Sequence, residues 1–303
     1  MHKYFRAIGY SEPMKIIDRY NLIDDVLSKA QSRSFITSEE DEEYMMAELR
    51  YDLGEGYGIC ASGIISEDEE FLCEALYPFY LGSGVSSIEE VSVEEKIEGN
   101  VYAGVIDDLN VGTTLIFHLL NSVEFLKSGC RQVDPIPGST AILSALSVEG
   151  TVMLPIQKTE QERQEIRNRS RQRKKLMGKA RSGDENAMQD LSVQDMEIYA
   201  SVMDKLQYDD VYTLVDSYFM PTGAECDLYS VMGEIVQCRM TQNPVTLEKV
   251  WLLTISCNEL RFDVCINQLD LFGDPAPGRR FKGIIWMQGI LQLPYYENKV
   301  DNK

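Results

Sequence analysis

The sequence predicts an α+β fold in three segments: an N-terminal, mainly antiparallel α/β domain over residues 1–156, a helical connector with a basic arm over 157–223, and a small β-barrel over 224–303. Three observations support this fold class. A chain of 303 residues is long enough for about two ordinary domains. Its 44% hydrophobic and 26% charged residues are typical of a globular protein. Strand-like and helix-like patterns occupy separate parts of the chain instead of alternating, which disfavours a parallel sheet.

The N-terminal segment begins with a predicted helix and continues as closely spaced strands. Apolar residues recur at nearly 3.6-residue spacing between Glu12 and Ala30, which is the helical period. Short β-like runs then follow one another from Tyr44 to Pro155, with turn signals such as Gly54-Glu55-Gly56 between them. Such short connections favour hairpins over βαβ crossovers, so we expect a mainly antiparallel sheet.

The middle segment is predicted to be helical. Residues 158–180 are almost entirely polar and cannot form a core helix alone. Ser182 and Glu185 have the spacing of a capping box, which ends one helix and begins the next. Asp209–Phe219 has apolar residues at helical spacing and predicts a further short helix closed by Pro221.

The charge of the chain is unevenly distributed. Residues 158–181 hold ten of the 29 Lys and Arg residues and three of the 49 Asp and Glu residues, a net charge of +7. The remainder carries 19 minus 46, or −27, within a total of −20. We single out six cations as the basic arm: Arg167, Arg169, Arg171, Arg173, Lys174 and Lys175.

Three interpretations of the basic arm remain open: a helix neutralised by its own chain or by a second copy, a nucleic-acid contact, or a contact with another acidic partner. The acidic remainder of the chain repels polyanions at long range. Residues 158–195 contain no aromatic side chain on which a base could stack. The first interpretation is therefore favoured.

The C-terminal segment contains four strand-like runs between Asp227 and Leu293, separated by turn-rich stretches. Glycines inside the first and last runs, Gly233, Gly283 and Gly289, suit the bends of a small closed barrel. The pattern resembles the OB fold, a five-stranded barrel that binds oligonucleotides or oligosaccharides.

The last run carries the candidate ligand-binding residues Arg279, Arg280, Lys282 and Trp286. Strand alternation places the last three on one face, beside Ile284. Cations next to aromatic rings are how OB barrels hold single-stranded nucleic acid. The favoured alternative is that Trp286 and Phe281 belong to the barrel core, while the arginines pair with local acids such as Asp270 and Asp274.

The sequence lacks the residues that most catalytic mechanisms require. The chain has two histidines, and His118 lies within an apolar run where a core position is expected. Gly273–Arg280 imitates a phosphate loop but lacks the lysine and the following helix. The contiguous acids Glu39–Glu43 predict a solvated turn rather than a Mg²⁺ site. We expect no cofactor and no metal site.

Targeting signals are also missing. The seven cysteines form no CxxC pair and are expected to be reduced thiols. The longest apolar runs are much shorter than the roughly 18 residues of a membrane-spanning helix, and the N-terminus lacks the apolar core of a signal peptide. These features predict a cytoplasmic protein without membrane contact.

Three stretches carry a family resemblance: Met1–Gly9, Gly183–Met188 ("GDENAM") and Gly278–Gly289 ("GRRFKGIIWMQG"). Through them the chain resembles a family of uncharacterised bacterial proteins of about this length that form a domain of unknown function. The resemblance supports the order of the segments and implies no activity.

The sequence thus favours a non-enzymatic cytosolic binding or assembly module without a cofactor, which self-associates or binds a protein partner. One alternative is a nucleic-acid-associated protein that uses the basic arm and the strand from Arg279 to Trp286. A second alternative is a metal-dependent hydrolase built from scattered carboxylates in the N-terminal domain.

Overall fold

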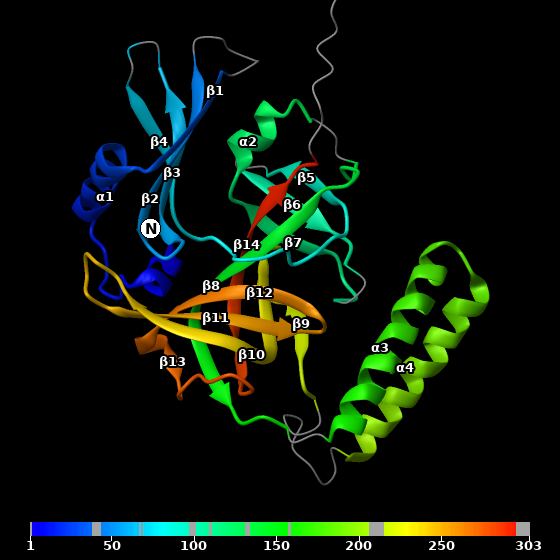
Figure 1. Ribbon diagram of the computed structural model, residues 1–303. Coiled ribbons are helices and arrows are strands. Elements are labelled where there is room, and N and C mark those ends of the chain that lie inside the picture. Colours follow the sequence, from blue (N-terminus) through cyan, green and yellow to red (C-terminus); the bar gives the residue numbers. More distant parts are fainter. Residues whose placement is uncertain are drawn as a thin grey trace, which may run out of the picture.

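A computed structural model describes residues 2–37, 44–66, 68, 70–96, 101–108, 111–130, 134–156, 159–205 and 215–294. It confirms the α+β class (Figure 1). The strands form two sheets, A and B, and a pair of long helices stands beside sheet B. In the described part of the chain, no helix is both long and apolar enough to cross a membrane.

Sheet A is an antiparallel meander in the order β1-β2-β3-β4, made of β1 (Ser32–Thr37), β2 (Met45–Gly54), β3 (Tyr57–Ile65) and β4 (Phe71–Tyr80). The turn between β2 and β3 has positive φ at Glu55 (45°) and Gly56 (84°), which is the backbone of a tight hairpin. The helix expected from Glu12 to Ala30 is α1 (Ile16–Lys29), which packs against β2 and β3. The predicted antiparallel arrangement is confirmed here.

Sheet B runs in the order β13-β8-β12-β11-β10-β14-β7-β6-β5, and β9 (Tyr218–Pro221) pairs with β10. Its remaining strands are β5 (Val91–Glu95), β6 (Tyr102–Ile106), β7 (Leu115–Leu119), β8 (Thr140–Met153), β10 (Leu228–Gln242), β11 (Lys249–Cys257), β12 (Leu260–Asn267), β13 (Leu271–Phe272) and β14 (Arg280–Gln292). An additional antiparallel pairing of β8 with β14 closes β8, β12, β11, β10 and β14 into a five-stranded barrel.

The barrel confirms the expected closed sheet, but one of its strands comes from elsewhere in the chain. β8 lies before the helical connector, pairs in parallel with β12 and runs antiparallel to β14 along thirteen residues. Sheet B therefore continues across the predicted boundary at residue 156. Periodicity identified β8 as a strand, whereas its partners lie too far along the chain for a local pattern to reveal.

Strand alternation divides the side chains of β14 between two cores. Phe281, Ile285 and Met287 belong to the core cluster of the barrel interior. Trp286 points the other way and packs into a second core, which also contains Ile59 and Phe79 of sheet A. The alternation predicted for this strand is thus seen in its packing, and the second core joins the barrel to sheet A.

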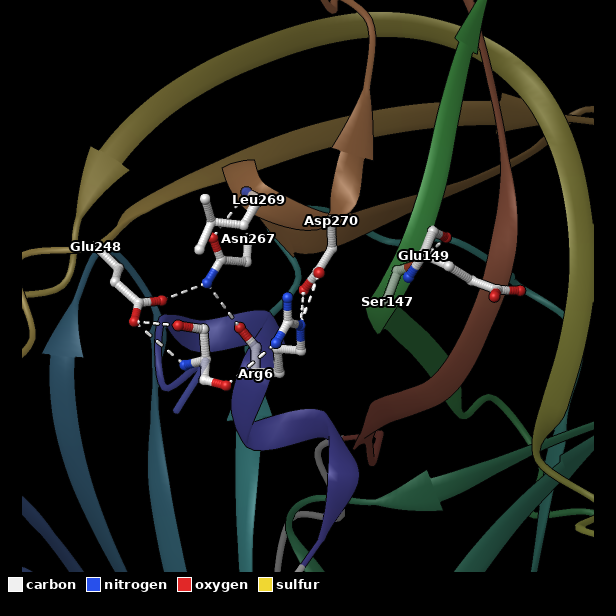
Figure 2. A network of polar contacts seen from close by, with 8 residues as sticks. Arg6, Ser147, Glu149, Glu248, Asn267, Leu269 and Asp270 are labelled. Carbon is white, nitrogen blue, oxygen red and sulfur yellow. Dashed lines mark hydrogen bonds and ion pairs between the residues drawn. The ribbon is translucent and has the colours of Figure 1, made fainter. Parts of the chain in front are cut away.

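A short 3₁₀ helix at the N-terminus, η1 (Lys3–Ile8), packs into this second core. Figure 2 shows its polar contacts with the barrel connections. Nε of Arg6 donates to both carboxylate oxygens of Asp270, at 2.6 and 2.7 Å. Nδ2 of Asn267 donates to the Arg6 carbonyl and to Glu248, and Glu248 accepts from Ser11. Asp270 is the last residue of η2 (Gln268–Asp270), which connects β12 to β13. Side-chain hydrogen bonds and an ion pair therefore attach η1 to the barrel.

The helical connector forms a hairpin of α3 (Glu160–Arg181) and α4 (Glu185–Lys205). The chain reverses at Gly183, where φ is 91°, so the helix boundary was predicted at the right place. The capping residue differs from the predicted Ser182: Oδ1 of Asp184 accepts from the N–H groups of Asn186 and Ala187, while the Ser182 hydroxyl donates to the Lys179 carbonyl of α3. The short helix expected over Asp209–Phe219 is wrong at its end, because Tyr218 and Phe219 belong to β9 and pair with Met232 and Val231. Residues 209–214 lie outside the described residues. The β-branched and aromatic content of this run, which the helical spacing outweighed, indicated the strand.

Candidate functional site: a groove between the helical hairpin and the barrel

The structure brings parts of both predicted sites to one groove, which lies between the α3–α4 hairpin and the rim of the barrel. Arg169, Arg173 and Lys174 of the basic arm line one side. Arg279 and Arg280 line the barrel side. The groove also has an apolar lining, which includes Leu154, Pro155, Ile156, Ile166, Met177 and Pro277.

Arg280 is the most deeply placed cation of the groove, with 7% of its surface exposed. Its Nε donates to the carbonyl of Leu154 at 3.0 Å, and its Nη1 donates to the carbonyl of Val215 at 3.0 Å. These carbonyls flank the hairpin on its two sides in the sequence. Arg280 therefore ties together the two chain segments that lead into and out of the hairpin. Burial lowers the pKa of its guanidinium.

The neighbouring Arg279 makes a different contact from the one expected. Its Nη1 donates to the backbone carbonyl of Asp274 at 2.6 Å, while Asp270, the other acid considered as a partner, pairs with Arg6. Within the described residues, neither arginine of this strand is paired with a carboxylate.

On the hairpin side, two arm residues contact acids of the same chain. Arg173 pairs with Asp195 of α4 at 2.7 Å, although its Nη1 is buried without a hydrogen-bond partner. Lys174 lies 3.8 Å from Glu89, next to β5. Toward the turn of the hairpin, Arg181 donates to the carbonyl of Asp107. Acids of the same chain therefore neutralise part of the positive charge of the basic arm.

Four of the other candidate residues, Arg171, Lys175, Lys282 and Trp286, are not part of the groove lining. Arg171 and Lys175 are exposed on α3, and the side chain of Arg167 lies outside the described part of the structure. Lys282 is half-buried on β14. Trp286 is 5% exposed, with the His2 ring 4.2 Å and the His118 ring 5.2 Å from its own. The N-terminus and sheet A therefore cover the ring that stacking on a base would require.

A second polar cluster escaped the sequence analysis. A small enclosed cavity lies between β2 of sheet A and β7 of sheet B, lined among others by Glu48, Tyr77 and His118. Beside it, Arg50 pairs with Glu48 at 2.5 Å and also donates to the carbonyl of Leu120. Glu48 and Arg50 are two positions apart on β2, a spacing that a solvent-exposed strand face also shows. Their place in a mostly apolar strand was the one sequence feature that could have indicated a buried pair.

Burial dominates the ionisation of this cluster. It lowers the pKa of His118 to about 3, and it lowers that of His2 to about 4. It raises the pKa of Glu48, against the opposing charge of Arg50, and raises that of the Cys60 thiol to about 12. His118 is therefore neutral near pH 7, and its Nε2 is buried without a hydrogen-bond partner.

A metal centre finds no support in the described residues, which contain no group of three His, Cys, Asp or Glu side chains placed to hold an ion. The acids Glu39–Glu43, which were expected to form a solvated turn, lie outside these residues. All seven cysteines are free thiols, and Cys226 is exposed.

Comparison with known proteins gives one family. A family model described as "Domain of unknown function, E. rectale Gene description (DUF3881)" matches residues 5–289. No curated protein and no solved structure matches the chain.

Proposed function

Because the chain belongs to the DUF3881 family, a domain of unknown function, along almost its whole length, we propose its role from its own surfaces: a non-enzymatic cytoplasmic assembly module that pairs with a second copy through the α3–α4 hairpin. The observation that carries this proposal is an uncovered apolar surface on α4. Met188 is 49%, Val193 49% and Met196 66% exposed.

The described side chains of the hairpin bury little apolar surface. Ala187 is the one buried apolar residue among its described side chains. Helices of this length in water depend on packing of an apolar face rather than on intrinsic propensity. A partner that covers α4 would supply that packing.

The charges of the hairpin favour a second copy as the partner. The sequence of α3 has nine basic and three acidic residues, a net +6, and that of α4 has one basic and five acidic residues, a net −4. Two-fold pairing places α3 of one copy against α4 of the other and sets opposite charges face to face. In the alternative arrangement, with α3 against α3 and α4 against α4, charges of the same sign would face and repel each other.

Light scattering after size-exclusion chromatography, over a range of protein concentrations, tests this proposal. We expect a dimer that weakens as salt rises, since exposed charges are screened. The double variant Met188→Glu/Met196→Glu should dissociate it at least about tenfold more readily, because charged side chains would be buried at the interface. Leu72→Glu, at a 62% exposed position of β4, is the matched control. A monomeric wild-type protein, or a double variant that dimerises like the control, contradicts the proposal.

A nucleic-acid-associated role is the second candidate, and one observation favours it. Arg169, Arg171 and Lys175 are exposed and form no ion pair with any described residue. Single-stranded RNA or DNA binding that falls steeply with salt, and that weakens in an Arg169→Gln/Arg171→Gln/Lys175→Gln variant, supports this role. An absence of binding at low salt removes it.

A further inference from the structure

The groove contains a buried positive charge whose counter-charge is missing from the described residues. Arg280 offers five N–H donors. Its Nε donates to the Leu154 carbonyl, and its Nη1 donates to the Val215 carbonyl and, at 3.9 Å, to Sδ of Met232, so Nη2 is the nitrogen left for a ligand. All three acceptors are uncharged, and no ion pair joins the guanidinium to a carboxylate of the described residues. An isolated buried cation is costly, and such groups are usually paired. Arg280 is thus set up to receive an anion.

The surroundings of Arg280 favour an anion of single charge. The groove lining contains five cations, Arg169, Arg173, Lys174, Arg279 and Arg280, and four carboxylates, Glu197, Asp216, Glu234 and Glu259, so five minus four leaves +1. A phosphate of higher charge would meet repulsion from these carboxylates. A carboxylate would accept from the N–H groups of Nη2, and hydrogen bonds between ionised partners are stronger than neutral ones.

The walls of the groove indicate what the carboxylate is attached to. Leu154 is 74% and Ile166 44% exposed, and Ile156, Met177 and Pro277 also line the groove. An apolar body against these side chains would remove them from water while its anionic end reaches the arginines.

We propose that the groove binds a monocarboxylate with an apolar body, whose carboxylate pairs with Arg280. Arg173 supplies a second donor through its unpartnered Nη1. The carboxylate belongs either to a free organic acid or to the C-terminus of a polypeptide that ends in an apolar residue. Both sources present the same chemistry to the groove.

Binding can be measured on the full-length protein by NMR titration and thermal shift with three probes: hexanoate, inorganic phosphate, and a peptide ending in leucine with a free or an amidated C-terminus. We expect hexanoate to bind, phosphate to bind less tightly, and amidation of the peptide to weaken its binding about tenfold or more. A strong effect of amidation identifies a polypeptide terminus as the source, whereas tighter binding of hexanoate than of the peptide identifies a free acid.

Variants locate the site. Arg280→Lys keeps the charge but loses the Nη2 donors, and we expect it to weaken hexanoate binding about tenfold. Because Arg280 also joins two chain segments, Arg173→Gln on the hairpin side provides a second variant that spares those bonds and should weaken binding several-fold. Arg261→Lys, at an exposed position of β12 outside the groove, is the control. No hexanoate binding, tighter phosphate binding, or equal binding by all three variants overturns the proposal.

Discussion

The Glu48–Arg50 pair shows how much can depend on one buried contact. Their side chains are 6% and 12% exposed, and Arg50 additionally donates to the Leu120 carbonyl of the segment that follows β7. The pair therefore links sheet A to sheet B through charge as well as through apolar packing. A buried ion pair contributes little relative to an apolar pair, but removing one partner leaves an uncompensated charge.

We predict that Arg50→Met lowers the free energy of unfolding by about 3–5 kcal/mol. The pKa of Glu48 is already raised by burial and would rise further without Arg50. A carboxyl whose pKa is higher in the folded than in the unfolded protein loses stability as the pH rises, so the loss should be greater at pH 8 than at pH 5. Urea denaturation at both pH values measures it.

The double variant Glu48→Met/Arg50→Met serves as the control for that experiment. It removes both charges and should recover a large part of the loss. A double variant as unstable as Arg50→Met would show that the bond from Arg50 to Leu120, rather than the ion pair, carries the effect.

His118 illustrates a different residue-level cost, a buried polar nitrogen without a partner. We predict that His118→Phe raises the free energy of unfolding by about 1–3 kcal/mol at pH 7. The pKa of His118 is about 3 in the folded protein against 6.5 for the ordinary side chain, mainly through burial and also through the charges of Lys96, His2 and Arg50, with Asp227 opposing them.

The pH dependence follows from that difference. Between pH 6.5 and about 3 the unfolded chain binds the proton and the folded protein does not, so the wild-type protein loses stability as the pH falls through this window. The advantage of His118→Phe should therefore increase from pH 7 to pH 4 in thermal denaturation. A constant difference across this range would contradict the assigned environment of His118.

At the level of elements, the join between the barrel and β5–β7 depends on one aromatic ring. β7 meets β14 through a short parallel pairing at Gln288–His118 and Gly289–Leu119. A Cβ on Gly104 of β6 would lie 2.1 Å from the Phe117 ring, and one on Gly289 would lie 2.6 Å from it. The two glycines thus make room for Phe117 in the core.

We predict that Gly104→Val destabilises the protein by about 1–3 kcal/mol, because the ring must leave its position. Adding Phe117→Leu to the Gly104→Val variant should restore part of the lost free energy of unfolding. Gly84→Val is the matched control, since a Cβ there meets no atom within 4 Å. Chemical denaturation compares the three, and equal losses at both glycines would exclude crowding as the cause.

Element types were largely predictable because they depend on local periodicity. The strands of sheet A, the helix of Ile16–Lys29 and the boundary of the hairpin at Gly183 follow from spacing, turn glycines and capping residues. The run ending at Phe219 was assigned to a helix because its helical spacing was given more weight than its β-branched and aromatic content, whereas Tyr218 and Phe219 pair with β10.

At the level of the whole molecule, the hairpin is an insertion into the barrel. Leu154 lies before the hairpin in the sequence and Val215 lies after it, and the carbonyls of both accept from the Arg280 guanidinium. A short linker can therefore bridge them. We predict that replacing residues 158–214 by a few glycines and serines leaves a folded protein whose melting temperature changes by only a few degrees.

Circular dichroism and thermal denaturation of the shortened chain check this prediction. Retained strand signal with a cooperative transition supports it, and the dimer attributed to the hairpin should be lost at the same time. Failure to fold would show that the hairpin contributes to the barrel core.

Molecule-level features were the least predictable from sequence. The closed barrel was expected, whereas the contribution of β8, the docking of η1 and the burial of Trp286 depend on pairings between distant segments. The groove could be anticipated only in its parts, since the basic arm and the strand at Arg280 are separated by about a third of the chain and meet only after folding. Nothing in the sequence around Glu48 or His118 indicates that the two side chains line the same cavity.

The position of β8 has a consequence for biosynthesis. When this strand leaves the ribosome, its neighbours β12 and β14 have not yet been translated, so the nascent chain must carry a long, largely apolar strand with unsatisfied edges until the last strand emerges. We therefore expect newly made protein to depend on chaperones, and chains that stop short of Arg280 to aggregate.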